Sequence, residues 1–289
     1  MAYYLIQALN AVSLSVLLML LALGLSLMLS LMNFINLAHG SFYLLGSYVA
    51  IFWLAAGLPW YLALPAAFLA AALAGLILDR YPLGLFYQRT HLMQVLLTYG
   101  LSVMFADLMR WGFGAEIMSL PMPDALRGVV FILGLPFPLY RLYVIGVGIV
   151  LAFGLWYLVE RTLWGAAMRA CVSDRRMVET LGIDTRRIFT VAMVVAGGLG
   201  GLAGALGGGL LSAYPGLDEE VLLLALLVVV VGGLGNMTGT ILSAILMGFI
   251  TTFARIFLPE FANVISLGAV AAILLIRPDG LFAHKARRV

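Results

Sequence analysis

The side chains best suited to chemistry lie between residues 33 and 48, which read NFINLAHGSFYLLGSY. His39 is at the centre of this stretch, with Asn33 and Asn36 before it and Ser41 after it. Such groups could bind a polar ligand, relay a proton or pair a nucleophile with a base. They follow a long apolar run in a part of the sequence that carries no formal charge. Because polar groups within lipid are costly unless they line a cavity or meet a partner, we expect a functional site here.

A second polar interruption is the sequence GGLGNMTGT at residues 232–240, where glycines flank Asn236 and Thr238. Interrupted helices with polar residues at the break indicate substrate pathways in transporters. We therefore expect the polar side chains of the two breaks to line one central crevice. The alternative is that the asparagines before His39 cap helix ends, while His39 binds a backbone carbonyl.

The composition predicts an all-α polytopic integral membrane protein. Apolar residues make up 64% of the chain, charged residues 10%, and the mean hydropathy is +1.12, whereas soluble domains hold about 25% charged residues. Residues 1–289 are expected to form a single transmembrane domain of eight or nine helices, because one short apolar run is either a crossing or a broken, re-entrant segment. With about 20 apolar residues needed per span, the candidate spans are 9–31, 37–57, 61–78, 93–111, 139–159, 188–211, the short run 221–235, 238–258 and 261–277.

Basic residues orient these spans. Most of the 16 Lys and Arg residues lie in three segments, 79–92, 160–187 and 277–289. The positive-inside rule makes these segments cytoplasmic, with the N-terminus outside and the C-terminus in the cytoplasm. Because the basic residues are confined to short loops that flank the membrane, lipid is the expected neighbour and no nucleic-acid partner is expected.

The cytoplasmic loop at about 160–187 is expected to contain a short helix outside the lipid. Ser173 or Asp174 can cap this helix, Gly182 can end it, and Asp184 can cap the next one. A helix of barely two turns is marginal alone and needs a surface to dock on. The alternative is a solvated loop clamped by its own ion pairs. The apolar residues of the short helix are Met177, Val178 and Leu181, and its charged ones are Asp174, Arg175, Arg176 and Glu179.

Four blocks of sequence together resemble a known family. In their order and spacing they are similar to the LivH-type permease subunit of branched-chain amino acid ABC importers. The blocks are NFINLAHGSFYLLGSY at 33–48, RACVSDRRMVETLGIDTRRIF at 169–189, GGLGNMTGT at 232–240 and LLIRPDGLF at 274–282.

This resemblance implies a subunit of a bacterial inner membrane that pairs with a second, similar permease. Two ATPase subunits would drive transport, and an extracytoplasmic binding protein would deliver the ligand. ATP and Mg²⁺ would bind to the ATPase subunits, so no cofactor, metal ion or catalytic residue is expected in this chain. The only lysine, Lys285, follows no Gly-rich turn and cannot complete a phosphate-binding loop.

The resemblance also implies that the short cytoplasmic helix couples the permease to the ATPase. This coupling helix would run from Ser173 to Leu181 and be closed by Gly182. The general importer signature in this loop begins Glu-Ala-Ala, whereas this chain has Gly165 at its first position. The coupling residues carried over are Ser173, Asp174, Arg175, Arg176, Met177, Val178, Glu179, Leu181 and Gly182.

Other functions share some of these features. An intramembrane enzyme would need a base beside its nucleophile, but His39 and Ser41, two residues apart on a helix, do not share a face. A secondary transporter could relay protons through His39, Asp107 or Arg110, but Asp107 and Arg110 are spaced to pair with each other. Within the importer class, urea or a short-chain amide is the alternative substrate, because the quoted motifs do not separate these classes.

Asp107, near one end of its span, is the only carboxylate expected within the spans. A zwitterionic amino acid would therefore find no clamp of a carboxylate and a cation in the interior of the membrane. We expect this chain to bind a free branched-chain amino acid weakly, with a millimolar dissociation constant, which corresponds to a binding free energy of about −4 kcal/mol. Specificity is expected to reside in the binding protein.

Overall fold

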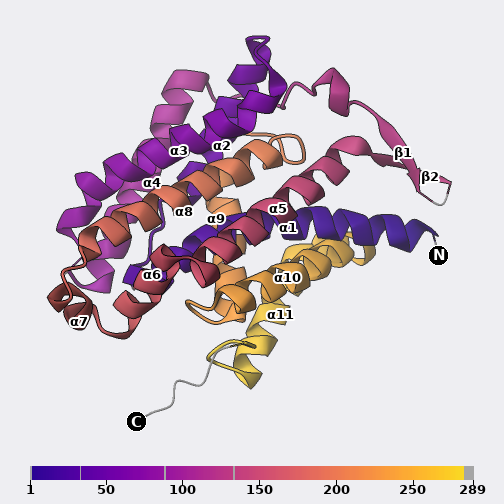
Figure 1. The fold of residues 1–289 in the computed structure, drawn as a ribbon. Coiled ribbons are helices and arrows are strands. Elements are labelled where there is room, and N and C mark those ends of the chain that lie inside the picture. The colour runs from indigo at the N-terminus through magenta and orange to yellow at the C-terminus, as the bar shows by residue number, and fades with distance from the viewer. Residues whose placement is uncertain (1, 33, 88, 133, 283–289) are drawn as a thin grey trace.

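The structure, a computed structural model, describes residues 2–32, 34–87, 89–132 and 134–282, and it is almost entirely helical (Figure 1). The predicted all-α polytopic class is confirmed. A two-stranded antiparallel hairpin, β1 (Val129–Ile132) and β2 (Leu135–Pro138), lies at one end of the molecule. The short 3₁₀ turns are η1 (Trp60–Leu62), η2 (Leu83–Leu85), η3 (Asp124–Leu126) and η4 (Pro259–Phe261). The helices are α1 (Ala2–Met32), α2 (His39–Ala55), α3 (Ala63–Arg80), α4 (His91–Phe113), α5 (Leu139–Arg161), α6 (Leu163–Ser173), α7 (Arg175–Thr180), α8 (Thr185–Gly207), α9 (Leu217–Gly232), α10 (Met237–Phe257) and α11 (Ala262–Ile276).

Each expected span contains a helix, but the helices differ in length. Seven helical segments in the described chain are long and apolar enough to cross a membrane. Helix α11 has 15 residues and reaches 18 only together with η4. The two helices outside these seven segments are α2 with 17 residues and α9 with 16, which rise only about 24–26 Å. Both of these helices follow or precede one of the two sequence breaks.

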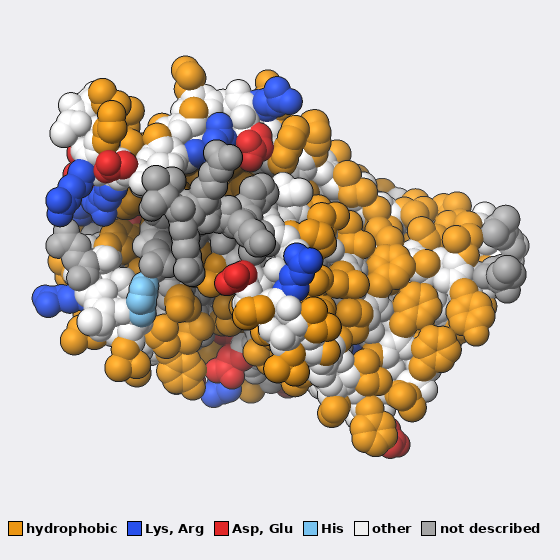
Figure 2. Space-filling model, turned by 90° about the horizontal axis from the view of Figure 1, so that it is seen from below, with side chains coloured by type: hydrophobic (Ala, Val, Ile, Leu, Met, Phe, Trp, Pro, Cys, Tyr) orange, Lys and Arg blue, Asp and Glu red, His pale blue; other side chains and the backbone are white. Residues whose placement is uncertain are grey.

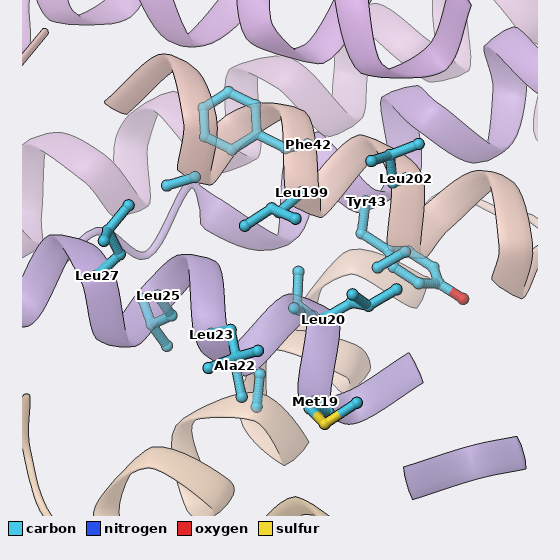
Figure 3. Packing of buried hydrophobic residues seen from close by; sticks show 14 of the residues in the cluster. Met19, Leu20, Ala22, Leu23, Leu25, Leu27, Phe42, Tyr43, Leu199 and Leu202 are labelled. Carbon is cyan, nitrogen blue, oxygen red and sulfur yellow. The ribbon is translucent and has the colours of Figure 1, made fainter. Parts of the chain in front are cut away.

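Helix α1 is the centre of the bundle. Every residue from Ser15 to Met28 is buried, as expected for a helix that is apolar on all sides. Helices α5, α8, α9 and α10 pack around it. Figure 3 shows leucines of α1 facing Phe42 of α2 and Leu199 and Leu202 of α8.

Small residues of α8 allow close packing within this chain. A Cβ added at Gly204 would lie 1.8 Å from the carbonyl oxygen of Tyr43, and one at Gly201 would lie 2.7 Å from that of Ala67. Ser47 Oγ donates to the Gly204 carbonyl at 2.8 Å. The Gly-rich face of α8 is thus covered by α2 and α3 of the same subunit.

The cytoplasmic loop differs from its prediction, because it holds two helices instead of one. Ser173 ends the eleven-residue helix α6, and the short helix α7 begins at Arg175, so the predicted start at Ser173 is wrong. The reason is Asp174, whose backbone is extended (φ −154°) and whose carboxylate accepts from the Met177 N–H at 3.0 Å. Gly182, with φ of +80°, follows α7, as predicted for a left-handed terminator.

The described parts of the three basic segments lie together at one end of the molecule. Thr190, near the start of α8, donates to Asp79 at the end of α3, and Arg169 and Arg277 border the same cavity. In the view of Figure 2, hydrophobic side chains cover most of the surface, and most of the charged ones lie toward the end that carries α7.

Candidate functional site

The first break, defined as residues 34–38 between α1 and α2, turns back into the bundle. His39, the first residue of α2, lies beside α1, with its Nε2 atom 3.1 Å from the carbonyl oxygen of Leu21. Because α1 continues to Met32, about 16 Å further along its axis, α2 begins well inside the thickness of the bundle. The break therefore lies at the depth of the membrane and not at its surface.

The described polar side chains of this break are engaged internally. His39 is fully buried, and a Cβ at Gly24 would lie 3.0 Å from its ring. Its Nδ1 atom has no hydrogen-bond partner among the described residues. Asn36, also fully buried, accepts from the Ala38 N–H at 3.0 Å. The His39 contact matches the alternative in which this side chain binds a backbone carbonyl. Asn36 does not cap α2 as that alternative expected, because the N-cap residue is Ala38 and has no side-chain cap bond; Asn33 lies outside the described residues.

Helix α4 seals the first break from the side. Thr98, fully buried, accepts from the Leu37 N–H at 3.1 Å, while its own hydroxyl hydrogen has its nearest acceptor in the Gln94 carbonyl of α4, at 2.9 Å. A side chain of α4 thus satisfies a backbone N–H that an extended segment would otherwise leave unpaired in lipid.

Ser41 leads to a residue that the sequence reasoning missed. Its Oγ atom lies 3.4 Å from Ser102 Oγ of α4 and 3.5 Å from Asp218 Oδ2 in the first turn of α9. Asp218 is 1% exposed and also accepts from the Gly216 N–H at 3.2 Å. Helices α2, α4 and α9 therefore meet at one buried polar cluster, formed by Ser41, Ser102 and Asp218.

Asp218 corrects the expectation that Asp107 is the only carboxylate within the spans. A Cβ at Gly40 would lie 2.2 Å from the Asp218 carbonyl oxygen, so Asp218 lies at the depth where α2 begins. The sequence contained a signal: Asp218 shares the buried helical face of Val221, Leu222 and Ala225, whereas the two glutamates that follow it are exposed.

The second break, residues 233–236 between α9 and α10, is built by glycines with positive φ. Gly233 has φ of +93° and Gly235 of +77°, conformations that a side chain disfavours. Asn236 caps α10 by accepting from the Gly239 N–H at 3.0 Å, and its Nδ2 atom donates to the Phe282 carbonyl at 2.5 Å. Thr238 is exposed.

This second break opens onto a cavity of about 1400 Å³. Asn236 and Thr238 line it, together with Ser30 of α1 and the ion pair Glu160–Arg169 at 3.6 Å. The described side chains of the first break do not border it. The structure thus brings the two breaks against the same helix, α1, but does not place their polar side chains around one crevice.

The coupling segment is held against the bundle and presents an exposed face. Arg175 pairs with Glu179 at 2.9 Å, and Glu179 accepts from Thr185 Oγ1 at 2.7 Å. Val178 is 3% exposed, whereas Met177 and Leu181 are 62% and 69% exposed. The hydrogen bonds from Thr185 and Arg175 lower the pKa of Glu179. The ionised Glu179 therefore stabilises the folded protein at pH values above the ordinary pKa of a glutamate, and this contribution is lost as pH falls through the lowered pKa.

The geometry gives no support to the rival chemistries. His39 Nε2 faces Leu21 and Ser41 faces Asp218 and Ser102, so the two side chains do not form a nucleophile and base pair. Asp107 pairs with Arg110 at 3.2 Å on the exposed surface, as the spacing predicts. Within the described ranges, no three His, Cys, Asp or Glu side chains are grouped to hold a metal ion.

Comparisons with known proteins agree on one family. The family model for the permease component of branched-chain amino acid transport systems matches residues 7–276. A probable branched-chain amino acid transport permease protein LivH of Methanocaldococcus jannaschii is 31% identical, over 94% of this chain and 90% of that protein. The high-affinity branched-chain amino acid permease proteins BraD of Pseudomonas aeruginosa and LivH of Escherichia coli K12 are 24% and 25% identical, each over 98% of this chain and 96% of the relative.

One solved structure shares the fold. PsaBC from Streptococcus pneumoniae, in complex with a Fab, matches with a TM-score of 0.53 over 92% of this chain and 89% of that chain. Its sequence identity is 11%, so this likeness concerns the fold alone.

Proposed function

This chain belongs to the family of branched-chain amino acid transport permease components, and we propose that it is the transmembrane subunit of an ATP-driven importer of branched-chain amino acids. The observation that carries the proposal is the family match across residues 7–276. The names of the relatives favour these amino acids over urea or short amides as the substrate.

The proposal includes the partners that such an importer requires. A second permease of similar fold pairs with this chain, two ATPase subunits bind ATP and Mg²⁺, and an extracytoplasmic protein delivers the ligand. Helix α7 suits an ATPase contact, because it presents Met177 and Leu181 to solvent while Val178 holds it to the bundle. Exposed apolar residues beside charged ones are typical of a docking surface.

The orientation follows from charge. The end that carries α7 and the described basic segments faces the cytoplasm of a bacterial cell, and the N-terminus faces outward. In this orientation the cavity at the second break opens on the cytoplasmic side, between α1, α5, α6 and α9 to α11. The Ser41–Ser102–Asp218 cluster lies nearer the outer side than this cavity, because Asp218 is in the first turn of α9 and the cavity is at the other end of that helix.

The main experiment is reconstitution of the whole importer in proteoliposomes. Uptake of labelled leucine, isoleucine or valine is expected to require ATP and the binding protein and to be insensitive to a protonophore. Uptake of labelled urea and of labelled acetamide is measured in the same way, to test the alternative substrate class. Protonophore-sensitive uptake at constant ATP, or transport of urea in place of leucine, would contradict the proposal.

A second experiment addresses coupling. Reversing two charges on α7, with Arg176→Glu and Glu179→Lys together, should uncouple ATP hydrolysis from uptake while the subunit stays inserted. A typical coupling between sites is about 1–3 kcal/mol, so uptake per ATP should fall about tenfold. The matched control reverses another exposed pair, Asp124 and Arg127 at 2.9 Å, at the opposite end of the molecule. Normal transport by the α7 variant would show that α7 is not the docking element.

A further inference from the structure

The segment between α3 and α4 connects the coupling helix to the first break through a series of aromatic contacts. The series begins at α7, where the Arg175 guanidinium lies 4.9 Å from the ring centroid of Phe189, in α8. A cation over an aromatic face is attracted by the ring quadrupole. A displacement of α7 would therefore change the surroundings of the Phe189 side chain.

Tyr87 is the next residue in the series. Its ring contacts Phe189 edge-on, with centroids 6.4 Å apart, and contacts Phe34 edge-on at 5.4 Å on the other side. Phe34 is fully buried and is the first described residue of the first break. One side chain thus touches both the helix that follows the coupling loop and the segment that precedes His39.

The Tyr87 hydroxyl is held by a buried carboxylate. It donates to Asp79 Oδ1, and Thr190 Oγ1 donates to the second oxygen, Oδ2, at 2.6 Å. Asp79 is 4% exposed. Burial, followed by the hydrogen bond to Asp79, raises the pKa of the Tyr87 hydroxyl, so this proton stays on Tyr87 at physiological pH. The carboxylate therefore fixes the ring of Tyr87 relative to both α3 and α8.

Helix α4 makes a second connection between the same two regions. Gln94 Nε2 donates to the carbonyls of Phe86 and Arg89, each at 3.2 Å, on either side of Tyr87. One turn later Thr98 holds the backbone of the first break. The backbone on either side of Tyr87 and the backbone of the first break are thus both bound by side chains on one face of α4.

We propose that Tyr87 is a positioning residue that passes movement of α7 to the first break, through Phe189 on one side and Phe34 on the other. This inference rests on the proposed function, since it needs α7 to contact the ATPase. It assigns a role to the segment between α3 and α4, which the coupling motif does not include.

The test uses the complete importer in proteoliposomes, with binding protein and ATP, and measures leucine uptake and ATP hydrolysis in parallel. Tyr87→Leu removes both ring contacts, Phe34→Leu removes the inner contact alone, and Tyr87→Phe removes only the hydroxyl. The matched control is Tyr81→Leu, because Tyr81 lies in the same segment but is 70% exposed. Uptake per ATP hydrolysed should fall about tenfold in Tyr87→Leu, less in Phe34→Leu and Tyr87→Phe, and not at all in Tyr81→Leu.

The double variant Phe34→Leu with Tyr87→Leu separates a relay from a general loss of packing. A relay predicts that the second substitution adds little to the loss of coupling, because both interrupt the same series. If Tyr87→Leu fails to assemble, the relay is tested with Phe34→Leu and Tyr87→Phe, again by the ratio of leucine uptake to ATP hydrolysed.

Suppose that the Tyr87 and Phe34 variants assemble with an unchanged ratio of leucine uptake to ATP hydrolysed, while charge reversal on α7 still lowers that ratio. This result would overturn the relay and leave the proposed function intact. An importer in which α7 reversal has no effect would instead overturn the docking assignment on which the relay depends.

Discussion

The two helix breaks look alike in sequence but are enclosed differently. The first break is buried, with Thr98 of α4 binding its backbone and His39 set against α1. The second break lies at the edge of a cavity of about 1400 Å³, where Thr238 is exposed. Polar residues between apolar runs therefore indicate an interruption, but elements distant in sequence decide whether that interruption is sealed or open.

The two breaks should also differ in how much a substitution changes the stability of the folded protein. In the first break, buried groups depend on fixed protein partners, and removing a partner leaves a polar atom unpaired in a dry environment. In the second break, water in the cavity can take over a lost hydrogen bond. Substitutions at the first break should therefore lower stability, whereas those at the second should change transport more than stability.

The largest effect is expected from Gly40→Val, in the first turn of α2 directly after the first break. Its Cβ would lie 2.2 Å from the carbonyl oxygen of Asp218 and 3.0 Å from Cβ of Leu222. Because a backbone atom cannot move aside, the free energy of unfolding should drop by about 3 kcal/mol or more. The control is Gly154→Val in α5, where an added Cβ meets no described atom within 4 Å. Denaturation of the purified subunit in mixed micelles measures both, and equal stability of the two variants would refute the sealed packing.

The second largest effect should come from His39→Ala. Losing a fully buried ring leaves a cavity between α1 and α8, which should cost about 2 kcal/mol of unfolding free energy. His91→Ala, at an exposed position in the first turn of α4, should change the free energy by less than about 0.5 kcal/mol. Normal stability of His39→Ala with lost uptake would instead make His39 part of the substrate pathway.

A smaller effect is expected for Asn236→Ala at the second break. The substitution removes the cap on α10 and the bond to Phe282, and a lost cap costs about 1 kcal/mol. Asn236→Asp keeps the capping acceptor and loses only the amide donor, so its thermal midpoint should fall less. If both variants lose as much stability as His39→Ala, the contrast between the breaks is wrong.

The smallest change in stability should come from Thr238→Val. This side chain is exposed to the cavity, so the free energy of unfolding should change by less than about 0.5 kcal/mol, while uptake by the reconstituted importer falls. Thr251→Val is the opposite control, because Thr251 is buried and lies 3.3 Å from the Ser266 hydroxyl. That control should lose stability and keep uptake. Full uptake by Thr238→Val would remove this residue from the pathway.

Local sequence patterns predicted much of the structure. Hydrophobic runs located the spans, and Asp174, Gly182 and Asp184 lie at helix ends as their chemistry predicts. Helix α6, with Arg169 as its single basic residue, was missed because its eleven residues lie in a loop that was expected to hold only one helix. The surroundings of the breaks were not predictable, since Thr98, Ser102 and Asp218 come from helices far along the chain. Only Asp218 left a local signal, in its spacing from buried apolar neighbours.

The burial of α1 has a consequence for biogenesis. This helix is synthesised before its neighbour α8, which begins only at Thr185. At ordinary translation rates α1 therefore waits in lipid for roughly 10–30 s before that neighbour emerges. Two of its serines need no partner from a later helix. Ser13 and Ser15 donate to the carbonyls of Leu9 and Ala11, at 3.0 and 2.8 Å, within their own helix. Ser26 differs, because its hydroxyl accepts from Thr240 of α10 at 3.1 Å. The future centre of the bundle can therefore be solvated by lipid along most of its length, and Ser26 gains its partner only when α10 arrives.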